Sequence, residues 1–332
     1  MSILGGDKTL RWVEPFSRTM DEIHRSHDTG LCNRLLHWEI AQEINKHNNY
    51  EYTILLGHSR WPELDELIDL PNTKISPELE TESDKIKLKR LIDNSTPIGK
   101  NKLNQLLKSN WKLEGHSFYS SFGHNTLQDL YDTDKKEFNS SERPISTITL
   151  KDKNLENKIK DLTKGLVGIH IRRGRGIKYN QDNIETLPEE IREEYINFRK
   201  LEGEETCNFY IYDFVSDEVY FDIIDKFLKR NPNQKFYVSH DMPDNLFTYF
   251  KEKYQGIVYT KEYFYGLIND KFKTPIQHVK NVIDLFALSN TDIVLKHNIS
   301  TWSTFAHKYK EKIGFYHDDD IDEVIDNYLK IT

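Results

Sequence analysis

Residues 166–176 read LVGIHIRRGRG, and this stretch sets the architecture of the chain. Its first six residues form a short apolar run, the pattern of a strand buried on both faces of a parallel sheet. Three arginines and two glycines follow at once, so the strand ends in a cationic turn where the backbone can approach a ligand closely. Because side chains alternate along a strand, His170 and Arg172 share one face and Arg173 takes the other. We therefore expect Arg172 to face a ligand together with His170.

The rest of the second half alternates short apolar runs with helical patterns. Strands are expected at 235–239, 257–259 and 292–295, and helices at 219–229, 246–254, 278–289, 301–310 and 321–329. This alternation is typical of parallel crossover units whose sheet is covered by helices on both faces. The predicted fold class is therefore α/β with a doubly wound sheet, in which ligands bind beyond the carboxyl ends of the strands.

The first half carries a weaker version of the same pattern. Residues 31–44 have helical spacing, with apolar side chains at positions 31, 35, 36, 40 and 44, and residues 52–57 resemble a buried strand. Residues 76–112 are charged and helical in character, and the polar segment 132–154 is the expected linker. We predict two domains, residues 1–150 and 151–332.

Composition excludes several classes of protein. The chain has 332 residues, enough for two domains, and its 37% hydrophobic and 12% aromatic content excludes disorder throughout. The formal charge of -8 argues against a protein whose whole surface binds nucleic acid or anionic lipid. Two cysteines, Cys32 and Cys207, form neither a disulfide framework nor a zinc motif. With no signal-like start and no long apolar run, we expect a cytoplasmic protein that does not insert into membranes.

Polar residues interrupt or follow the predicted elements where ligands would bind. Asp241 ends the second strand and could accept hydrogen bonds from a ribose or sugar hydroxyl; a metal site with His240 lacks a third ligand. Ser300 precedes a helix that begins near Thr301, and the free N–H groups there form either an anion site or an ordinary cap. Asp284 interrupts an apolar helix face, where a buried carboxylate needs partners such as the N–H groups of a guanine edge.

A glycine turn opens the helical segment of the first half. Gly30 permits close approach of a ligand, and Asn33 and Arg34 add hydrogen-bond donors at a helix start. An ordinary capped turn is the alternative. For Arg172 and its neighbour the alternative is pairing with surface carboxylates of this acidic chain.

Together these segments resemble the GDP-fucose-dependent fucosyltransferase superfamily, which includes α-1,6-fucosyltransferases, nodulation-type enzymes and protein O-fucosyltransferases. Residues 167–173 resemble its His-x-Arg strand, residues 236–243 its second motif and residues 282–306 its third. The turn at residues 30–34 resembles its amino-terminal Gly-x-x-Asn segment. Where many α-1,6 members carry an aspartate, this chain has Arg175, and its Arg-x-Gly-x-Gly run is closer to the nodulation type.

The resemblance implies a GT-B fold, with two Rossmann-like domains and a cleft between them. The first domain would hold the acceptor, and the second would bind the nucleotide sugar. The implied activity is an inverting transfer of fucose from GDP-fucose to a glycan or glycoside hydroxyl, without a metal or other cofactor. Its partners would be this donor and a glycan acceptor, and no nucleic acid.

The resemblance also suggests roles for individual residues. Arg172 resembles the arginine that binds the β-phosphate and helps GDP to leave, and the backbone of His170 would meet the guanine region. Asp284 resembles the carboxylate that reads guanine, and Asp241 the first acidic residue of the second motif. Ser300 belongs to the phosphate-side loop, and the other expected donor-binding residues are Asn298, Thr301, Gly30, Asn33 and Arg34.

The chemistry of the transfer supports the choice of Arg172. Cleavage of the bond to GDP places negative charge on the β-phosphate, so a fixed cationic donor lowers the barrier. An acceptor hydroxyl also needs a base, and Asp182 and Glu185 are candidates by position, with solvated loop carboxylates as the alternative. Two other functions stay open: a glycosyltransferase that uses another GDP-sugar, and a catalytically silent protein that binds a nucleotide or glycan.

Overall fold

The computed structural model of this chain describes the secondary structure of about half of its residues. The described residues are 9–13, 31, 32, 35, 38, 39, 42, 52–56, 66–76, 117–119, 144–172, 215–241, 247–268, 272–274, 276–297, 300–309 and 313–331.

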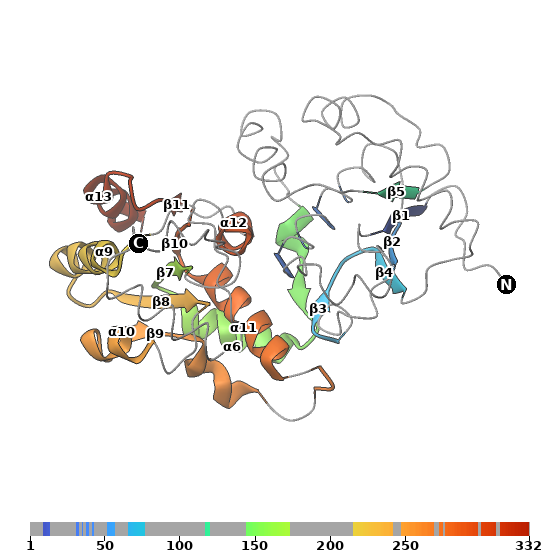
Figure 1. Cartoon of the computed structure of the whole chain (residues 1–332), viewed down its shortest axis with the longest axis horizontal. Helices are drawn as coiled ribbons and strands as arrows, with labels where there is room; N and C mark the ends of the chain where they lie inside the picture. The colour runs from blue at the N-terminus through green and yellow to red at the C-terminus, as the bar shows by residue number, and fades with distance from the viewer. Residues whose placement is uncertain are drawn as a thin grey trace, which may run out of the picture.

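The second half is built on a sheet of five parallel strands (Figure 1). The strands are β7 (Leu166–Ile171), β8 (Lys235–His240), β9 (Val258–Tyr259), β10 (Ile293–Leu295) and β11 (Ile313–Phe315). Their spatial order is β11-β10-β7-β8-β9, so the chain starts in the middle, moves outward through β8 and β9, and returns to the other side of β7. This reversal is the doubly wound order of Rossmann folds, with its switch point between β7 and β10.

Helices cover both faces of this sheet, as Figure 1 shows. One face packs against α9 (Asp217–Arg230), α10 (Thr248–Lys253) and α13 (Ile321–Ile331), and the other against α6 (Lys153–Thr163), α11 (Ile276–Asn290) and α12 (Thr301–Lys308). Alternate residues of one strand therefore enter different cores: Phe236 and Val238 join the first, and Tyr237 joins the second. Burial on both sides explains why β7 reads as a continuous apolar run.

The first half contains a smaller sheet with the same winding. Its four parallel strands are β1 (Thr9–Val13), β2 (Tyr52–Leu56), β4 (Thr73–Ser76) and β5 (Ser117–Tyr119), in the order β4-β2-β1-β5. A separate antiparallel pair joins β3 (Ile68–Asp69) to β6 (Thr149–Leu150). The predicted α/β class is confirmed, and each half contributes a parallel sheet whose first strand lies inside it.

Most elements predicted in the second half are confirmed within a few residues. The structure adds β11 and the 3-10 helix η3 (Lys261–Leu267), and in the first half it adds β1, β4 and β5, none of which the sequence predicted. The six described residues between Leu31 and Gln42 are all helical, as expected. No helix in the described ranges combines the length and apolar character needed to cross a membrane.

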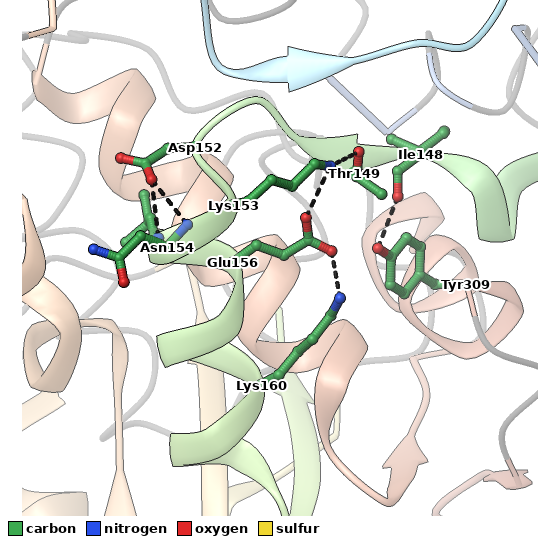
Figure 2. Close-up of polar contacts among 9 residues, drawn as sticks. Ile148, Thr149, Asp152, Lys153, Asn154, Glu156, Lys160 and Tyr309 are labelled. Carbon is green, nitrogen blue, oxygen red and sulfur yellow. Dashed lines mark hydrogen bonds and ion pairs between the residues drawn. The ribbon is translucent and has the colours of Figure 1, made fainter.

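The described end of the predicted linker is structured rather than open. Pro144–Thr147 form the 3-10 helix η1, and α6 begins at Lys153, with Asp152 accepting hydrogen bonds from two backbone N–H groups of its first turn. Glu156 is 2% exposed because Lys153 and Lys160, one turn away on either side, pair with its carboxylate (Figure 2). The described part of the predicted linker thus contains a 3-10 helix, strand β6 and the first two residues of α6, and the domain boundary near residue 150 stays a prediction.

The 3-10 helix η1 and strand β6 are also tied to the carboxyl-terminal sheet. The buried hydroxyl of Tyr309, at the end of α12, donates a hydrogen bond of 2.7 Å to the carbonyl of Ile148, as Figure 2 shows. Burial and the negative charge of Glu156 both raise the pKa of Tyr309, so this hydroxyl stays protonated and keeps donating.

The close approach of α11 to β7 gives a first prediction. A Cβ on Gly168 would overlap Thr291 Oγ1 and lie 3.0 Å from Leu288 Cδ1 and 3.2 Å from the carbonyl oxygen of Ile293. Thr291 is fully buried and its hydroxyl donates to the Leu288 carbonyl, so it has little room to move. We expect Gly168→Ala to lower the free energy of unfolding by about 1–3 kcal/mol in urea denaturation.

Gly266→Ala is the matched control, because a Cβ on Gly266 meets nothing within 4 Å. Equal stability of the two variants would contradict the close packing of α11 on β7.

Candidate functional site

The candidate site lies at the switch point of the larger sheet. Strands β7 and β10 run side by side, with Ile169 opposite Leu295, so the chain leaves both strands at the same edge. Arg172 follows β7 directly, and Ser300 and α12 follow β10. The crossovers from these two strands run in opposite directions, which makes the edge between their ends the switch point where doubly wound sheets bind ligands. The topology therefore brings Arg172 and the start of α12 to one edge, as the sequence predicts.

The charge of Arg172 acts on the imidazole of His170, and a shared face for the two side chains stays a prediction. His170 is 4% exposed, and burial is the main cause that holds the pKa of its imidazole well below 6.5. The charges of His297, Arg172 and His240 lower this pKa further. His170 is consequently neutral at pH 7, and among the described residues its Nδ1 has no hydrogen-bond partner.

A residue from the first half joins this cluster. Cys32 is 1% exposed, and burial raises the pKa of its thiol; Arg172 opposes this shift, and Asp284 adds to it. Cys32 therefore lies within electrostatic reach of both predicted ligand-binding residues. This places the helical segment between Leu31 and Gln42, which follows the predicted glycine turn, against the ends of the strands.

Ser300 occupies the N-cap position of α12, but its side chain does not cap the helix. Its Oγ is buried and has no hydrogen-bond partner within the described part of the chain. Its carbonyl accepts the Thr304 N–H at 3.0 Å and the Thr304 hydroxyl at 2.9 Å. The expected side-chain cap is therefore absent, which leaves the hydroxyl available beside the N–H groups of the first helical turn, where Thr301 also lies.

Asp284 is buried as expected, and its partners come from within the protein. Tyr237 donates a hydrogen bond of 2.5 Å to Oδ1, and Ser239 donates one of 2.6 Å to Oδ2. The indole N–H of Trp302 in turn donates to Ser239 Oγ at 3.1 Å. The sequence correctly indicated that this carboxylate needs partners, but the donors are two side chains of β8 that it did not identify.

The remaining predicted residues are only partly described. Asp241 is exposed directly after β8, and its neighbour His240 is buried and stacks on Phe247 with a centroid separation of 4.0 Å. Within the described ranges, no group of three or more His, Cys, Asp or Glu side chains is arranged to hold a metal ion. Several candidates lie outside the described residues, namely Gly30, Asn33, Arg34, Asp182, Glu185 and Asn298.

The sequence analysis missed a second buried carboxylate. Glu39 is 6% exposed, and its Oε2 has no hydrogen-bond partner among the residues that are described. It lies seven residues after Cys32, two helical turns along the same face. The sequence contains the same signal for Glu39 as for Asp284, because each is a charged residue that directly follows or precedes large apolar residues of a helix.

The described cluster has the chemistry of an anion site. It combines one guanidinium, a neutral imidazole, an uncommitted hydroxyl and the start of a helix, all at the carboxyl edge of a doubly wound sheet. Arginine and helix N-termini are the usual protein partners of phosphate groups. The arrangement can therefore bind a phosphate or diphosphate and stabilise charge that develops on it.

Comparison with known proteins finds similarity only among solved structures, since neither a family model nor a curated protein matches the chain. The fucosyltransferase NodZ from Bradyrhizobium is 9% identical, with 90% of this chain and 93% of that chain covered at a TM-score of 0.40. Its Se-Met form is 9% identical, with 90% and 91% covered and a TM-score of 0.43. NodZ alpha-1,6-fucosyltransferase soaked with GDP-fucose is 10% identical, with 90% and 92% covered and a TM-score of 0.41. Similarity at this level does not assign an activity to this chain.

The burial of His170 predicts a pH dependence of stability. The unfolded imidazole titrates near pH 6.5, whereas the folded one has a lower pKa, so below pH 6.5 the unfolded chain binds a proton that the folded chain does not. The free energy of unfolding is therefore unaffected by this histidine above pH 6.5. Below pH 6.5 it falls by up to about 1.4 kcal/mol per pH unit, until the pH reaches the folded pKa. Urea denaturation between pH 7.5 and pH 5.5 measures the slope, which should be smaller in His170→Gln than in the unmodified chain.

His278→Gln is the matched control, because His278 is not among the groups that act on His170. The burial argument fails if His170→Gln and His278→Gln keep the same slope as the unmodified chain.

Proposed function

We propose that this chain is a glycosyltransferase that moves fucose from GDP-fucose to a glycan or glycoside hydroxyl, with inversion and without a metal. One observation carries the proposal: the switch point of a doubly wound sheet brings Arg172 and the uncapped start of α12 to the same edge. Doubly wound sheets bind nucleotides at this position, with phosphate at a helix start.

The donor would bind through its diphosphate. The first N–H groups of α12 and the hydroxyl of Ser300 would hold one phosphate, and Arg172 would approach the β-phosphate from the end of β7. The neutral state of His170 is compatible with this arrangement, because an uncharged imidazole does not repel the guanidinium of Arg172. Asn298, Thr301, Asp241, Gly30, Asn33 and Arg34 remain proposed donor contacts from the sequence.

The transfer would proceed by departure of GDP from the sugar. The bond between the anomeric carbon and the β-phosphate oxygen breaks, its electron pair goes to that oxygen, and the sugar becomes oxocarbenium-like. Arg172 would stabilise the developing phosphate charge from a fixed position, which avoids the cost of reorganising solvent. The acceptor hydroxyl would attack from the opposite face and give its proton to a base, for which Asp182 and Glu185 are the proposed candidates.

The proposal assigns different tasks to the two halves. Residues 151–332 would bind the nucleotide sugar, and residues 1–150 would supply the acceptor side. Arg172 and Asp284 both act electrostatically on Cys32. This supports the arrangement, because Cys32 belongs to the first half and the other two residues belong to the proposed donor site. Analysing product masses with GDP-fucose and other GDP-sugars would identify the donor. A silent binder would be stabilised by GDP but would release no GDP from any of these donors.

Arg172→Ala tests the proposal directly. Losing one fixed donor to the leaving phosphate should reduce kcat/KM for GDP release from GDP-fucose by roughly 100-fold, about 3 kcal/mol of transition-state stabilisation. The rate is measured with a panel of glycan acceptors, and GDP affinity by calorimetry. Arg172→Lys should recover only part of the loss, because an ammonium lacks the planar fork of a guanidinium.

Arg230→Ala is the matched control. Arg230 lies at the end of α9 and pairs with Asp322 and Asp326 of α13 on the opposite face of the sheet, so its loss should leave turnover unchanged. Full turnover by a folded Arg172→Ala variant would refute the assigned role.

A further inference from the structure

We infer that Asp284 is a positioning residue that fixes the start of α12 through Ser239 and Trp302, and that it does not read the nucleotide base itself. The inference deepens the proposed function and rests on it for the identity of the ligand. The resemblance suggested that this carboxylate reads guanine. We assign it a different role because both of its oxygens accept hydrogen bonds from side chains of β8.

Each carboxylate oxygen of Asp284 accepts a hydrogen bond from a side-chain hydroxyl of β8. Tyr237 donates to Oδ1 at 2.5 Å and Ser239 donates to Oδ2 at 2.6 Å, and the carboxylate is 4% exposed. A carboxylate that reads a guanine edge presents both oxygens to two N–H groups of the base. Here each oxygen already accepts a short hydrogen bond from a side chain of β8, and hydrogen bonds to a carboxylate are among the strong ones.

The order of donors and acceptors is fixed along the network. An indole N–H can only donate, so the 3.1 Å contact requires Ser239 Oγ to accept from Trp302. The single hydroxyl proton of Ser239 is then directed to Asp284 Oδ2. Asp284 therefore orients Ser239, and Ser239 orients the indole of Trp302.

This network joins three elements around the candidate site. Tyr237 and Ser239 lie on β8, Asp284 lies on α11, and Trp302 is the second residue of α12. Ser239 pairs in register with His170 on β7, so the network lies directly beside the strand that carries Arg172. Trp302 comes two residues after Ser300, within the turn whose N–H groups would hold the phosphate. Asp284 thus sets the position of the anion site relative to Arg172.

Two predictions separate positioning from base reading. A positioning residue should affect every nucleotide diphosphate that uses α12, whatever its base. A base reader should affect the preference for GDP over inosine diphosphate, which lacks the exocyclic amino group of guanine. Three variants break the network at successive points: Asp284→Asn, Ser239→Ala and Trp302→Phe, the last of which removes the N–H and keeps most of the ring.

The experiment measures two quantities on the full chain. Hydrogen exchange of peptides that cover α12 reports how firmly the helix start is held, and calorimetry gives the Kd values of GDP and inosine diphosphate. We expect each variant to speed exchange in α12 and to raise both Kd values by about tenfold, with their ratio unchanged. The double variant Ser239→Ala/Trp302→Phe should be no weaker than the worse single variant, because both changes break one connected network.

Tyr249→Phe is the matched control. It removes a tyrosine–carboxylate hydrogen bond of 2.6 Å to Asp217, between α10 and α9 on the other face of the sheet, and should change neither quantity. If Asp284→Asn fails to fold, Ser239→Ala and Trp302→Phe carry the test without it.

The outcomes are distinct. Loss of the preference for GDP in Asp284→Asn, with unchanged exchange in α12, would show base reading and overturn the inference. Faster exchange with unchanged Kd values would show a structural bond only, and would also overturn it. If the unmodified chain binds neither nucleotide, the proposed function fails, and exchange in Ser239→Ala and Trp302→Phe alone decides whether the network holds α12.

Discussion

The end of β7 is the constraint on which the site depends. The chain leaves this strand towards β8 and later returns through β10 on its other side, so the carboxyl ends of β7 and β10 are neighbours whose crossovers diverge. Doubly wound sheets bind ligands at such a point, beyond the carboxyl ends of the strands. Gly168 permits the close packing of α11 on β7, since a Cβ at this position would overlap Thr291 Oγ1 and crowd Leu288. The site is therefore a consequence of winding order and close packing, before any catalytic side chain is considered.

Burial gives the polar groups at this edge their properties. His170 is neutral because charging it would cost desolvation and would oppose Arg172, and Asp284 retains its place in an apolar helix through two hydroxyl donors. The hydroxyl of Ser300 has no such compensation among the described residues. A buried polar atom without a partner costs free energy, and such atoms are rare in folded proteins unless a ligand or water satisfies them. Ser300 and His170, which both carry such an atom, thus lie at the edge where doubly wound sheets bind ligands.

The sequence predicted the second half well because its strands are buried on both faces, which gives short apolar runs such as 166–171 and 235–240. It did not predict α6, whose first two residues it assigned to the linker at 132–154, because the pairing of Lys153 and Lys160 with Glu156 is not visible as an apolar pattern. For the site, local pattern identified Arg172 and Asp284 as exceptional. It could not identify Tyr237 and Ser239 as donors to Asp284, because a contact between residues more than 40 positions apart leaves no periodic signal.

The two halves of the chain meet in one core rather than across a simple boundary. Leu31, Cys32, Leu35 and Trp38 belong to the same buried cluster as Val282 and Ile283 of α11, although a division near residue 150 assigns them to the other half. The helical segment that carries them thus packs on the face of the larger sheet that also presents His170 and Tyr237. Glu39 lies two helical turns after Cys32 and is also buried, so this segment carries a buried carboxylate as well as apolar surface. Because its apolar residues share a core with α11, the division of the sequence into two halves does not divide this core.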